Sequence, residues 1–266
     1  MKIVNKIYNI NGNIDKNIVL ISDIHYNSNK DIKHLNKVLD NIKKINPDFI
    51  CIPGDVIDNS NIIDYKLFNW LTKLSNIGKV ILTLGNHEYY INRKDNIYGI
   101  NEEYIKQLKN IENLYFLDNK NLVIDNINFI GLTLPISHYM VDGETIDSFN
   151  ENIKNIKTKF GYYNILLCHS PVNLTKEEVI SNLNIDLCLC GHMHGGVVPR
   201  FLRFIFKNNG LISPIKKLFP KDVYGNIKIG NKNIIITSGI KVLSESHFPI
   251  IGKFFSSEIV EIKIKQ

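Results

Sequence analysis

Seven side chains that can bind metal ions follow closely after five short apolar runs in this sequence. The runs and their polar ends read NIVLISDIH (residues 17–25), DFICIPGD (48–55), KVILTLGNHE (79–88), NILLCHSP (164–171) and IDLCLCGHMH (185–194). The seven candidates are Asp23, His25, Asp55, Asn86, His169, His192 and His194. Each of them alone has an ordinary explanation, such as a helix-capping aspartate or a loop histidine. Imidazole nitrogens with carboxylate and amide oxygens suit Mn, Fe, Co or Zn better than Ca, and a set without cysteine ligands disfavours a structural zinc site.

Each apolar run has the length of a strand that is buried on both faces. Apolar residues at helical spacing occur between the runs, at residues 31–45 and 61–74. Strands that alternate with helices predict a largely parallel sheet, and ligand sites in such sheets form beyond the carboxyl ends of the strands. We therefore expect the seven side chains to converge on one edge. Three glycines directly precede members of the set, and a residue without a Cβ allows the close backbone approach that such a site needs. These glycines are Gly54, Gly85 and Gly191.

The rest of the chain predicts mixed sheets rather than purely parallel ones. Residues 121–134 and 223–238 place turn residues between β-rich runs, as hairpins do, and residues 257–264 alternate like a half-exposed strand. We expect two mixed sheets packed together with helices outside. Because the sequence has no repeat of fixed period and no linker rich in Pro, Gly or Ser, residues 1–266 are expected to form a single domain.

Seven ligands are too many for one catalytic metal with an open position, and they suit two metals that share a bridging carboxylate. Two divalent ions carry more positive charge than two aspartates and a bridging hydroxide remove, and the remainder attracts a phosphate. Two metals about 3.5–4 Å apart can clamp the attacking and leaving oxygens of an in-line displacement and supply hydroxide at neutral pH. The set therefore predicts hydrolysis of an anionic phosphoester, with His192 and His194 reaching different metals from one loop.

Five motifs, in the order DIH, GDVID, GNHE, CHS and GHMH, resemble those of the calcineurin-like metallophosphoesterases over residues 18–194. The resemblance implies a four-layer α/β-β/α sandwich of two mixed sheets flanked by helices. It also implies two divalent transition metal ions (Mn²⁺, Fe²⁺/Fe³⁺ or Zn²⁺). The first would be bound by Asp23, His25, Asp55 and His194. The second would be bound by Asp55, Asn86, His169 and His192. His87 would then stabilise or protonate the leaving oxygen, and Asp58 would orient His87.

The motifs also differ from those of relatives at two positions. In phosphoprotein phosphatases an arginine follows the second aspartate of GDxxD, whereas Asn59 stands there in this chain. The loss of that guanidinium weakens the case for a phosphoprotein monoesterase. Glu88 stands where many relatives have aspartate, and we expect it to accept hydrogen bonds behind the ligands. The tail after residue 191 resembles a bacterial, membrane-associated, phosphodiesterase-like branch that includes enzymes splitting the pyrophosphate of UDP-diacylglucosamine.

From these features we expect an enzyme that hydrolyses phosphodiester or pyrophosphate bonds by attack of metal-bound hydroxide, on a lipid-linked or nucleotide-linked substrate. One alternative is a nuclease or a cyclic-nucleotide phosphodiesterase, and a more distant one is a non-catalytic scaffold of the same fold. The sequence contains no long basic stripe interleaved with aromatic residues, so a nucleic-acid substrate ranks lower. The intact ligand set together with His87 disfavours the scaffold.

The composition is that of an ordinary globular protein, with 44% hydrophobic and 22% charged residues among 266. The formal net charge of +6 favours an anionic substrate or surface but falls short of a nucleic-acid-binding signature. The N-terminus lacks the apolar core of a secretory signal, and no apolar run approaches the roughly 18 residues needed to span a bilayer. We therefore expect a cytoplasmic protein without the membrane anchor common in the branch above. The cysteines lie in apolar runs and are expected to be buried free thiols. They are Cys51, Cys168, Cys188 and Cys190.

The segment of residues 199–221, PRFLRFIFKNNGLISPIKKLFPK, mixes six basic residues with apolar ones and contains no acidic residue. It follows His194 closely and so must border the metal site, where it is expected to bind an anionic membrane surface. The other interpretation is a loop packed over the core. Of the remaining histidines, His34 is expected to be solvated, and His138 and His247 receive no role. The candidate phosphate contacts are Arg93, Arg200 and Arg203.

Overall fold

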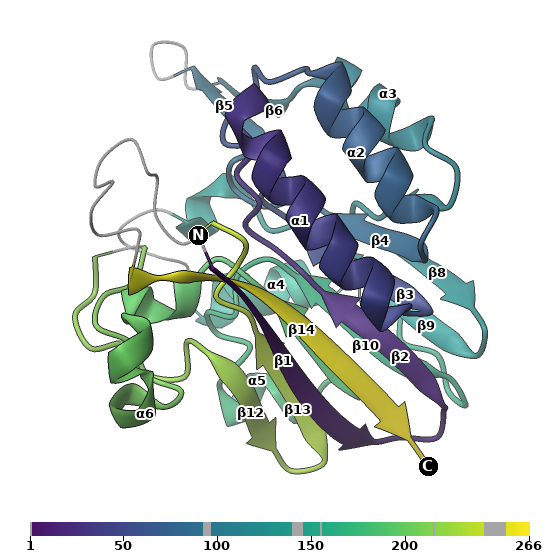
Figure 1. Cartoon of the computed structure of the whole chain (residues 1–266). Helices are drawn as coiled ribbons and strands as arrows, with labels where there is room; N and C mark the ends of the chain where they lie inside the picture. Colours follow the sequence, from purple (N-terminus) through teal and green to yellow (C-terminus); the bar gives the residue numbers. More distant parts are fainter. Residues whose placement is uncertain (1, 93–96, 140–145, 155, 215, 242–253) are drawn as a thin grey trace.

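The computed structural model describes residues 2–92, 97–139, 146–154, 156–214, 216–241 and 254–266, and it contains two six-stranded sheets (Figure 1). The first sheet has the strand order β1-β14-β2-β3-β4-β7. Its strands are β1 (Lys2–Asn11), β14 (Ser256–Lys265), β2 (Lys16–Leu20), β3 (Phe49–Pro53), β4 (Lys79–Thr83) and β7 (Leu114–Phe116). Strands β2, β3, β4 and β7 are parallel, whereas β14 is antiparallel to β2 and parallel to β1.

The second sheet has the strand order β12-β13-β11-β10-β9-β8. Its strands are β12 (Gly225–Ile229), β13 (Lys232–Ile236), β11 (Leu187–Cys190), β10 (Tyr163–Cys168), β9 (Ile127–Leu132) and β8 (Lys120–Ile124). The four inner strands are parallel, and both edge strands are antiparallel to their neighbours. The two predicted hairpins are therefore confirmed as the pairs β8–β9 and β12–β13.

The two sheets pack face to face over a shared apolar core. Phe49 of the first sheet meets Phe129 of the second, with ring centroids 4.9 Å apart. Leu20 and Ile81 from the first sheet and Leu167 from the second are also part of this core. Because helices cover the outer faces, the strands that precede the candidate ligands are buried over most of their length. Burial on both faces explains why these runs are almost continuously apolar.

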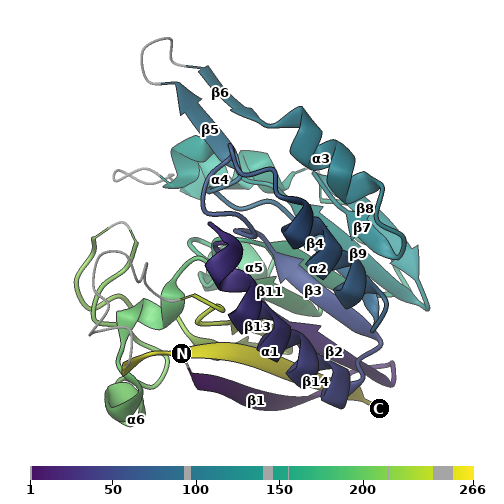
Figure 2. The same ribbon diagram turned by 45° about the horizontal axis from the view of Figure 1, so that its top comes forward.

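Helices form the two outer layers of the molecule. Figures 1 and 2 show α1 and α2 side by side over the first sheet, with α4 and α5 beyond the second. The helices of the first sheet are α1 (Asn29–Ile45), α2 (Tyr65–Ser75) and α3 (Glu102–Lys109). Those of the second are α4 (Ile146–Ile153) and α5 (Glu177–Ile180). The expected four-layer sandwich of two mixed sheets flanked by helices is confirmed.

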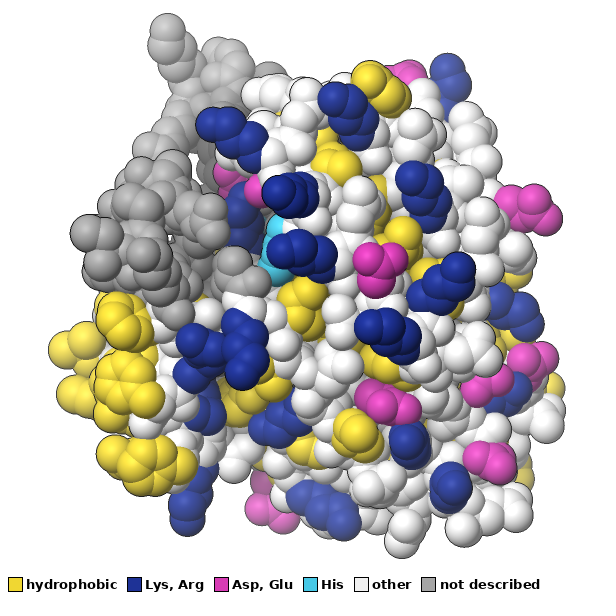
Figure 3. All heavy atoms as spheres, in the orientation of Figure 1, with side chains coloured by type: hydrophobic (Ala, Val, Ile, Leu, Met, Phe, Trp, Pro, Cys, Tyr) yellow, Lys and Arg dark blue, Asp and Glu magenta, His cyan; other side chains and the backbone are white. Residues whose placement is uncertain are grey.

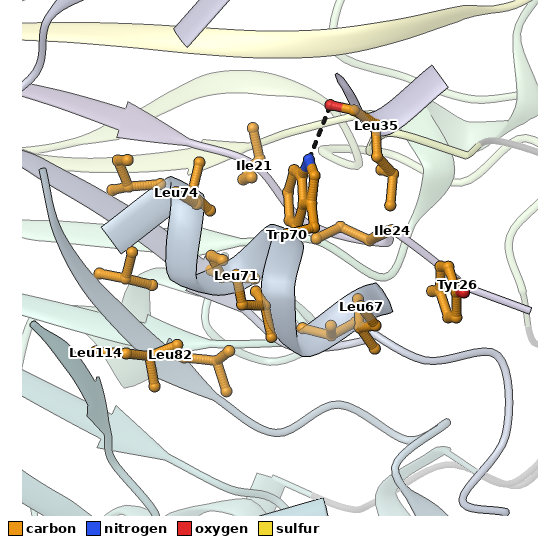
Figure 4. Close-up of a cluster of buried hydrophobic side chains, with 14 of the residues drawn as sticks. Ile21, Ile24, Tyr26, Leu35, Leu67, Trp70, Leu71, Leu74, Leu82 and Leu114 are labelled. Atoms are coloured by element: carbon orange, nitrogen blue, oxygen red, sulfur yellow. Dashed lines mark hydrogen bonds between the residues drawn. The ribbon is translucent and has the colours of Figure 1, made fainter. Parts of the chain in front are cut away.

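Capping decides where the second long helix begins. Helix α2 starts at Tyr65, four residues after the predicted start, because the carboxylate of Asp64 accepts a hydrogen bond from the backbone N–H of Lys66 (2.9 Å). Helix α1 begins two residues earlier than predicted. Trp70 of α2 donates its indole N–H to the carbonyl oxygen of Leu35 in α1 (2.9 Å; Figure 4). This bond ties the two helices together within the apolar layer above the first sheet.

The prediction that residues 257–264 form a half-exposed strand is wrong in its exposure. Strand β14 is an inner strand between β1 and β2, and it is buried over most of its length. The alternation was misleading because Glu258 and Glu261 are themselves buried. The strand β1 that covers the edge of β14 was not predicted either. Strand β14 also explains why His34 is not solvated as expected, since Nε2 of His34 forms a hydrogen bond with Oγ of Ser257 in β14 (2.6 Å).

The remaining described elements are short. They are β5 (Tyr89–Asn92) and β6 (Ile97–Ile100), the 3₁₀ turns η1 (Ile136–Tyr139), η2 (His194–Val197) and η3 (Arg200–Leu202), and the helical turn α6 (Arg203–Phe206). Within the described residues, every helix is too short or too polar to cross a bilayer. All four cysteines are buried and free, as predicted. The single-domain organisation stays a prediction.

Candidate metal centre

The strands β2, β3, β4, β10 and β11 bring their polar ends together, although they belong to two different sheets. Three groups of side chains among the described residues have potential ligand atoms within 4.8 Å of one another. Two of them consist only of candidate ligands: the first group is Asp23, His25 and His194, and the second is Asp55, His169 and His192. The remaining group joins His25 to Asp58 and His87. The seventh candidate, Asn86, follows β4 and has a buried side-chain oxygen. The first and second groups each contain ligands that the family resemblance assigns to one metal.

The carboxylate of Asp55, a member of the second group, also faces the first group. Its Oδ2 is 3.0 Å from Nε2 of His169 and 3.7 Å from Nε2 of His25. Oδ1 of Asp23 is 4.0 Å from Nε2 of His25 and 3.9 Å from Nε2 of His194. Asp55 therefore faces one histidine from each group, which is the position that a bridging carboxylate needs.

Five of the candidate ligands have a backbone conformation that is unfavourable for any residue with a Cβ. Their φ angles lie in the left-handed region: Asp23 at 50°, His25 at 45°, Asp55 at 53°, His192 at 67° and His194 at 47°. Each such conformation costs of order 1–3 kcal/mol and persists only where the surrounding structure enforces it. Strain of this kind clusters at functional sites. Its concentration in the ligand loops supports a functional role for these residues.

Two glycines allow the loops to approach the carboxylates closely. A Cβ added to Gly85 would collide with Oδ1 of Asp55, and one added to Gly191 would collide with Oδ2 of Asp23. Close approach, and not backbone freedom, therefore explains these two positions. Of the three predicted glycines, Gly54 alone has a left-handed φ, at 90°.

Hydrogen bonds hold the ligand loops in place from behind. The backbone N–H of His192 donates to Oδ1 of Asp23 (3.0 Å). Nδ1 of His169 donates to the carbonyl oxygen of Pro53 (2.7 Å), which leaves Nε2 directed at Asp55. The buried carboxylate of Glu88 accepts from four backbone N–H groups at 2.7–3.4 Å, which confirms its expected role as an acceptor. These donors belong to Asp55, Val56, Ile57 and Gly85.

Several buried polar atoms of the candidate ligands have no hydrogen-bond partner among the described residues. They are Nδ1 and Nε2 of His25, Oδ1 of Asn86, Nε2 of His169 and Nδ1 of His194. Buried polar atoms are nearly always paired, so a cluster of unpaired donors and acceptors indicates a ligand. Nitrogen and oxygen atoms of these types suit divalent transition metals. The residues present therefore fit the metal ions that the resemblance implies.

The protonation of the histidines supports the same fit. Burial lowers the pKa of His194 to about 4 and that of His192 well below its usual value. Both imidazoles are therefore neutral at neutral pH, as metal ligands must be. Burial also acts to lower the pKa of His169, but the carboxylates of Asp55 and Asp23 outweigh it and raise the value to about 9. The two carboxylates thus favour a positive charge at this imidazole, and a metal cation can replace the proton there.

His87 and Asp58 lie beside the first group. Nδ1 of His87 donates to the backbone carbonyl oxygen of Asp58 (2.7 Å), because a carbonyl oxygen can only accept. The carboxylate of Asp58 lies farther away, 3.9 Å from Nδ1 of His87 and 3.5 Å from Nδ1 of His25. The ring of His25 packs edge-on against that of His87, with centroids 4.5 Å apart. His87 is 38% exposed, so it is fixed through Nδ1 and its ring remains accessible from solvent.

Two residues beside the second group were missed in the sequence. The ring of Tyr139 lies 5.0 Å from that of His192 and 5.9 Å from that of His169. Nε2 of His138 is 3.1 Å from Oγ of Ser170, the residue that follows His169. Both missed residues lie in η1. No motif marks this turn, so the sequence carries no signal for it.

The three candidate phosphate contacts lie in different surroundings. Arg93 and the unassigned His247 lie outside the described residues. Arg200 is exposed and lines a pocket together with His194. Arg203 braces the loop that follows His194, because its guanidinium donates to three backbone carbonyl oxygens and lies over an aromatic ring. The carbonyls are those of Gly195, Lys207 and Asn209, and the ring is that of Tyr224.

The segment of residues 199–221 is anchored at its backbone but exposes apolar side chains. The N–H of Leu211 donates to the carbonyl oxygen of Gly196 (2.8 Å), which ties the segment to the metal loop. Six exposed apolar side chains, here called the apolar patch, gather on this side of the molecule (Figure 3, lower left). They are Phe201, Phe204, Ile205, Leu218, Phe219 and Phe254. The segment is therefore not simply a loop packed over the core.

The fold and the site together define the class as a metal-binding α/β protein, with two packed mixed sheets and metal-binding side chains grouped at the strand ends. Residues 16–196 match the family model described as calcineurin-like phosphoesterase, and the chain belongs to this family. An uncharacterised metallophosphoesterase of Campylobacter jejuni is 30% identical over an alignment of 258 residues, covering 94% of this chain and 59% of that protein. Another, of Aquifex aeolicus, is 31% identical over 212 residues, covering 73% of this chain and 65% of that protein. The chain thus spans less than two thirds of the length of either relative.

The chain is also similar to solved structures at low sequence identity. A dimetal phosphatase from Danio rerio is similar with a TM-score of 0.46 and 12% identity, over 84% of this chain and 87% of that one.

Proposed function

We propose that this chain hydrolyses phosphodiester or pyrophosphate bonds at a dinuclear metal centre. Asp23, His25, Asp55 and His194 would hold one metal, and Asp55, Asn86, His169 and His192 the other. The observation that carries the proposal is that the Asp55 carboxylate faces a histidine of each ligand group, His169 of its own group and His25 of the other. When bound, two divalent ions would polarise the phosphoryl oxygens and supply the nucleophile at neutral pH.

The proton for the leaving oxygen would come from His87. Its Nδ1 is fixed on the Asp58 carbonyl oxygen, so a proton on Nε2 can be transferred without reorienting the ring. The carboxylate of Asp58 would act mainly on His25, to which it is closer. His87 is therefore the proposed general acid, and Asp58 the residue that positions it through its backbone.

A diester or pyrophosphate is preferred to a phosphoprotein monoester as the substrate. The position of the phosphate-gripping arginine is held by Asn59, which is exposed and accepts a hydrogen bond from the backbone N–H of Asn61 (3.1 Å). The amide of Asn59 lacks the bidentate cationic fork that grips a dianionic monoester. Nuclease or cyclic-nucleotide phosphodiesterase activity is the second candidate.

A substrate panel with added Mn²⁺ tests this choice. We expect an aryl phosphodiester or a nucleotide-linked lipid to be hydrolysed with a higher kcat/KM than the matched aryl phosphomonoester. Faster hydrolysis of the monoester would contradict the proposal, and selective hydrolysis of cyclic nucleotides or DNA would favour the second candidate.

We also propose that the protein is cytoplasmic and associates with the surface of an anionic membrane through the segment of residues 199–221. The apolar patch supports this, since Phe204 is 76% and Phe219 is 67% exposed. Lysines beside the patch add positive charge, and each contributes about 1 kcal/mol near an anionic surface. The exposed ones within the segment are Lys207, Lys216, Lys217 and Lys221.

Co-sedimentation with liposomes tests the membrane proposal. The triple variant Lys207→Gln, Lys216→Gln and Lys217→Gln is expected to bind anionic vesicles about 100-fold more weakly at low salt. Arg203 is left unchanged because it braces the metal loop. The matched control removes three exposed lysines from α1, Lys37, Lys43 and Lys44, and should bind like the wild type. Equal losses in both variants, or no binding of the wild type, would contradict a specific docking surface.

A further inference from the structure

A pocket of about 240 Å³ lies directly beside the candidate metal centre. His194 forms part of its wall, and it is the only candidate ligand that does so among the described residues. Val198 and Arg200 line it from the segment after His194, while Ser256 at the start of β14 and Phe255 just before it line another side. A phosphoester bound at the metals could therefore extend its organic group past His194 into this pocket.

Two charged groups that line the pocket, Glu258 and Arg203, are already engaged within the protein. The carboxylate of Glu258 accepts hydrogen bonds from the Tyr224 hydroxyl, from Oγ1 of Thr237 (3.1 Å) and from the backbone N–H of Ser238 (3.2 Å). The guanidinium of Arg203 lies over the Tyr224 ring, 4.1 Å from its centroid, and donates to backbone carbonyls. Neither of these two groups is left to select a charged ligand. Arg200 also lines the pocket and is exposed, so it can face the anionic end of a phosphoester while the rest of the entering group meets mainly the apolar surfaces.

Those surfaces favour an apolar group with one polar atom. Val4, Val198 and Phe255 supply hydrocarbon walls. Ser256 supplies the polar contact, because its buried Oγ has no hydrogen-bond partner among the residues that the structure describes. An unpaired buried hydroxyl beside a pocket indicates a ligand atom that would bind it.

The pocket is adjacent to the exposed apolar patch. Phe201 and Phe254 are sequence neighbours of the pocket residues Arg200 and Phe255, and their rings pack against each other with centroids 5.9 Å apart. An apolar chain that left the pocket on this side would continue along aromatic surface instead of entering water.

We propose that this pocket binds the apolar organic group of the substrate, and that the substrate is an amphipathic phosphoester with a hydrogen-bonding oxygen next to its alkyl or acyl chain. The proposal rests on the proposed function, because the phosphate at the metals determines which group reaches the pocket. It adds a specificity site that is separate from the metal ligands except at His194.

The test uses alkyl 4-nitrophenyl phosphodiesters with methyl, butyl and octyl groups, which share one leaving group. For the wild type, kcat/KM is expected to rise by up to about fourfold for each methylene that becomes buried, and to level off once the pocket is full. Val4→Trp fills the pocket from the edge strand β1 and should lower the ratio of octyl to methyl kcat/KM at least tenfold. Ile7→Trp is the matched control on the same strand, since Ile7 is exposed and does not line the pocket.

A binding measurement separates failure of this inference from failure of the proposed function. Calorimetry with metal-loaded protein should show that octyl phosphate binds more tightly than methyl phosphate, and that Val4→Trp abolishes the difference. If no diester is hydrolysed but this binding pattern holds, the proposed function fails and the pocket assignment stands. A flat chain-length profile in the wild type, or an octyl preference unchanged in Val4→Trp, would overturn the pocket assignment.

Discussion

His87→Asn is expected to lower kcat by about 10²–10⁴-fold on a substrate with a poor leaving group, the usual contribution of a general acid. His87 makes its structural hydrogen bond through Nδ1 to a backbone carbonyl, and asparagine can keep that contact with its amide. The variant therefore removes the proton donor while disturbing the loop little. Metal content should stay close to that of the wild type, because His87 is outside the proposed ligand set.

Leaving-group dependence provides the control for this variant. A nitrophenolate needs little protonation as it departs, so the loss of kcat should be much smaller for aryl esters than for alkyl esters. A loss of equal size for good and poor leaving groups would contradict the acid role. His87 would then act on the phosphoryl group in the transition state instead.

Gly85→Ala is expected to reduce metal binding by about 10–100-fold, the range seen when partners of metal ligands are changed. The added methyl would collide with Oδ1 of Asp55 and with its backbone nitrogen, so the carboxylate between the two ligand groups must move. Because both proposed metals depend on that carboxylate, both should be lost together. Metal analysis after dialysis at fixed metal concentration measures the effect.

Gly161→Ala is the matched control for this substitution. Gly161 has a left-handed φ of 82°, but no atom lies within 4 Å of a Cβ added there. Its replacement by alanine should cost roughly 1 kcal/mol of stability through backbone strain and leave metal content unchanged. Equal metal loss in both variants would show that general destabilisation, and not the crowding of Asp55, is responsible.

The sequence predicted the parts of the fold that follow from continuous apolar runs. Strands such as β3 and β10 are buried on both faces, so their residues show no competing polar pattern. Strand β14 was misjudged because Glu258 and Glu261 are buried and satisfied by distant partners, among them Tyr224 and Asn17. Those partners lie far away in the sequence, and a local pattern cannot reveal them.

In the candidate site, too, some features could be predicted from the local sequence and others depend on distant contacts. The seven candidate ligands each follow a predicted strand, so their convergence could be expected from chain order and sheet geometry. Tyr139 reaches the second group from a 3₁₀ turn that no periodicity marks. Arg203 was expected to contact a phosphate, whereas its donors reach backbone carbonyls such as that of Gly195. Which acceptor an arginine finds depends on tertiary packing, and the sequence does not encode it locally.

Metal stoichiometry tests the dinuclear centre most directly. Protein purified without chelator and fully loaded should contain close to two transition-metal equivalents per chain. In Asp55→Asn both equivalents should fall, because Oδ2 of Asp55 faces His169 of one group and His25 of the other. One equivalent in the wild type, or the loss of only one of two equivalents in Asp55→Asn, would contradict a centre bridged by this carboxylate.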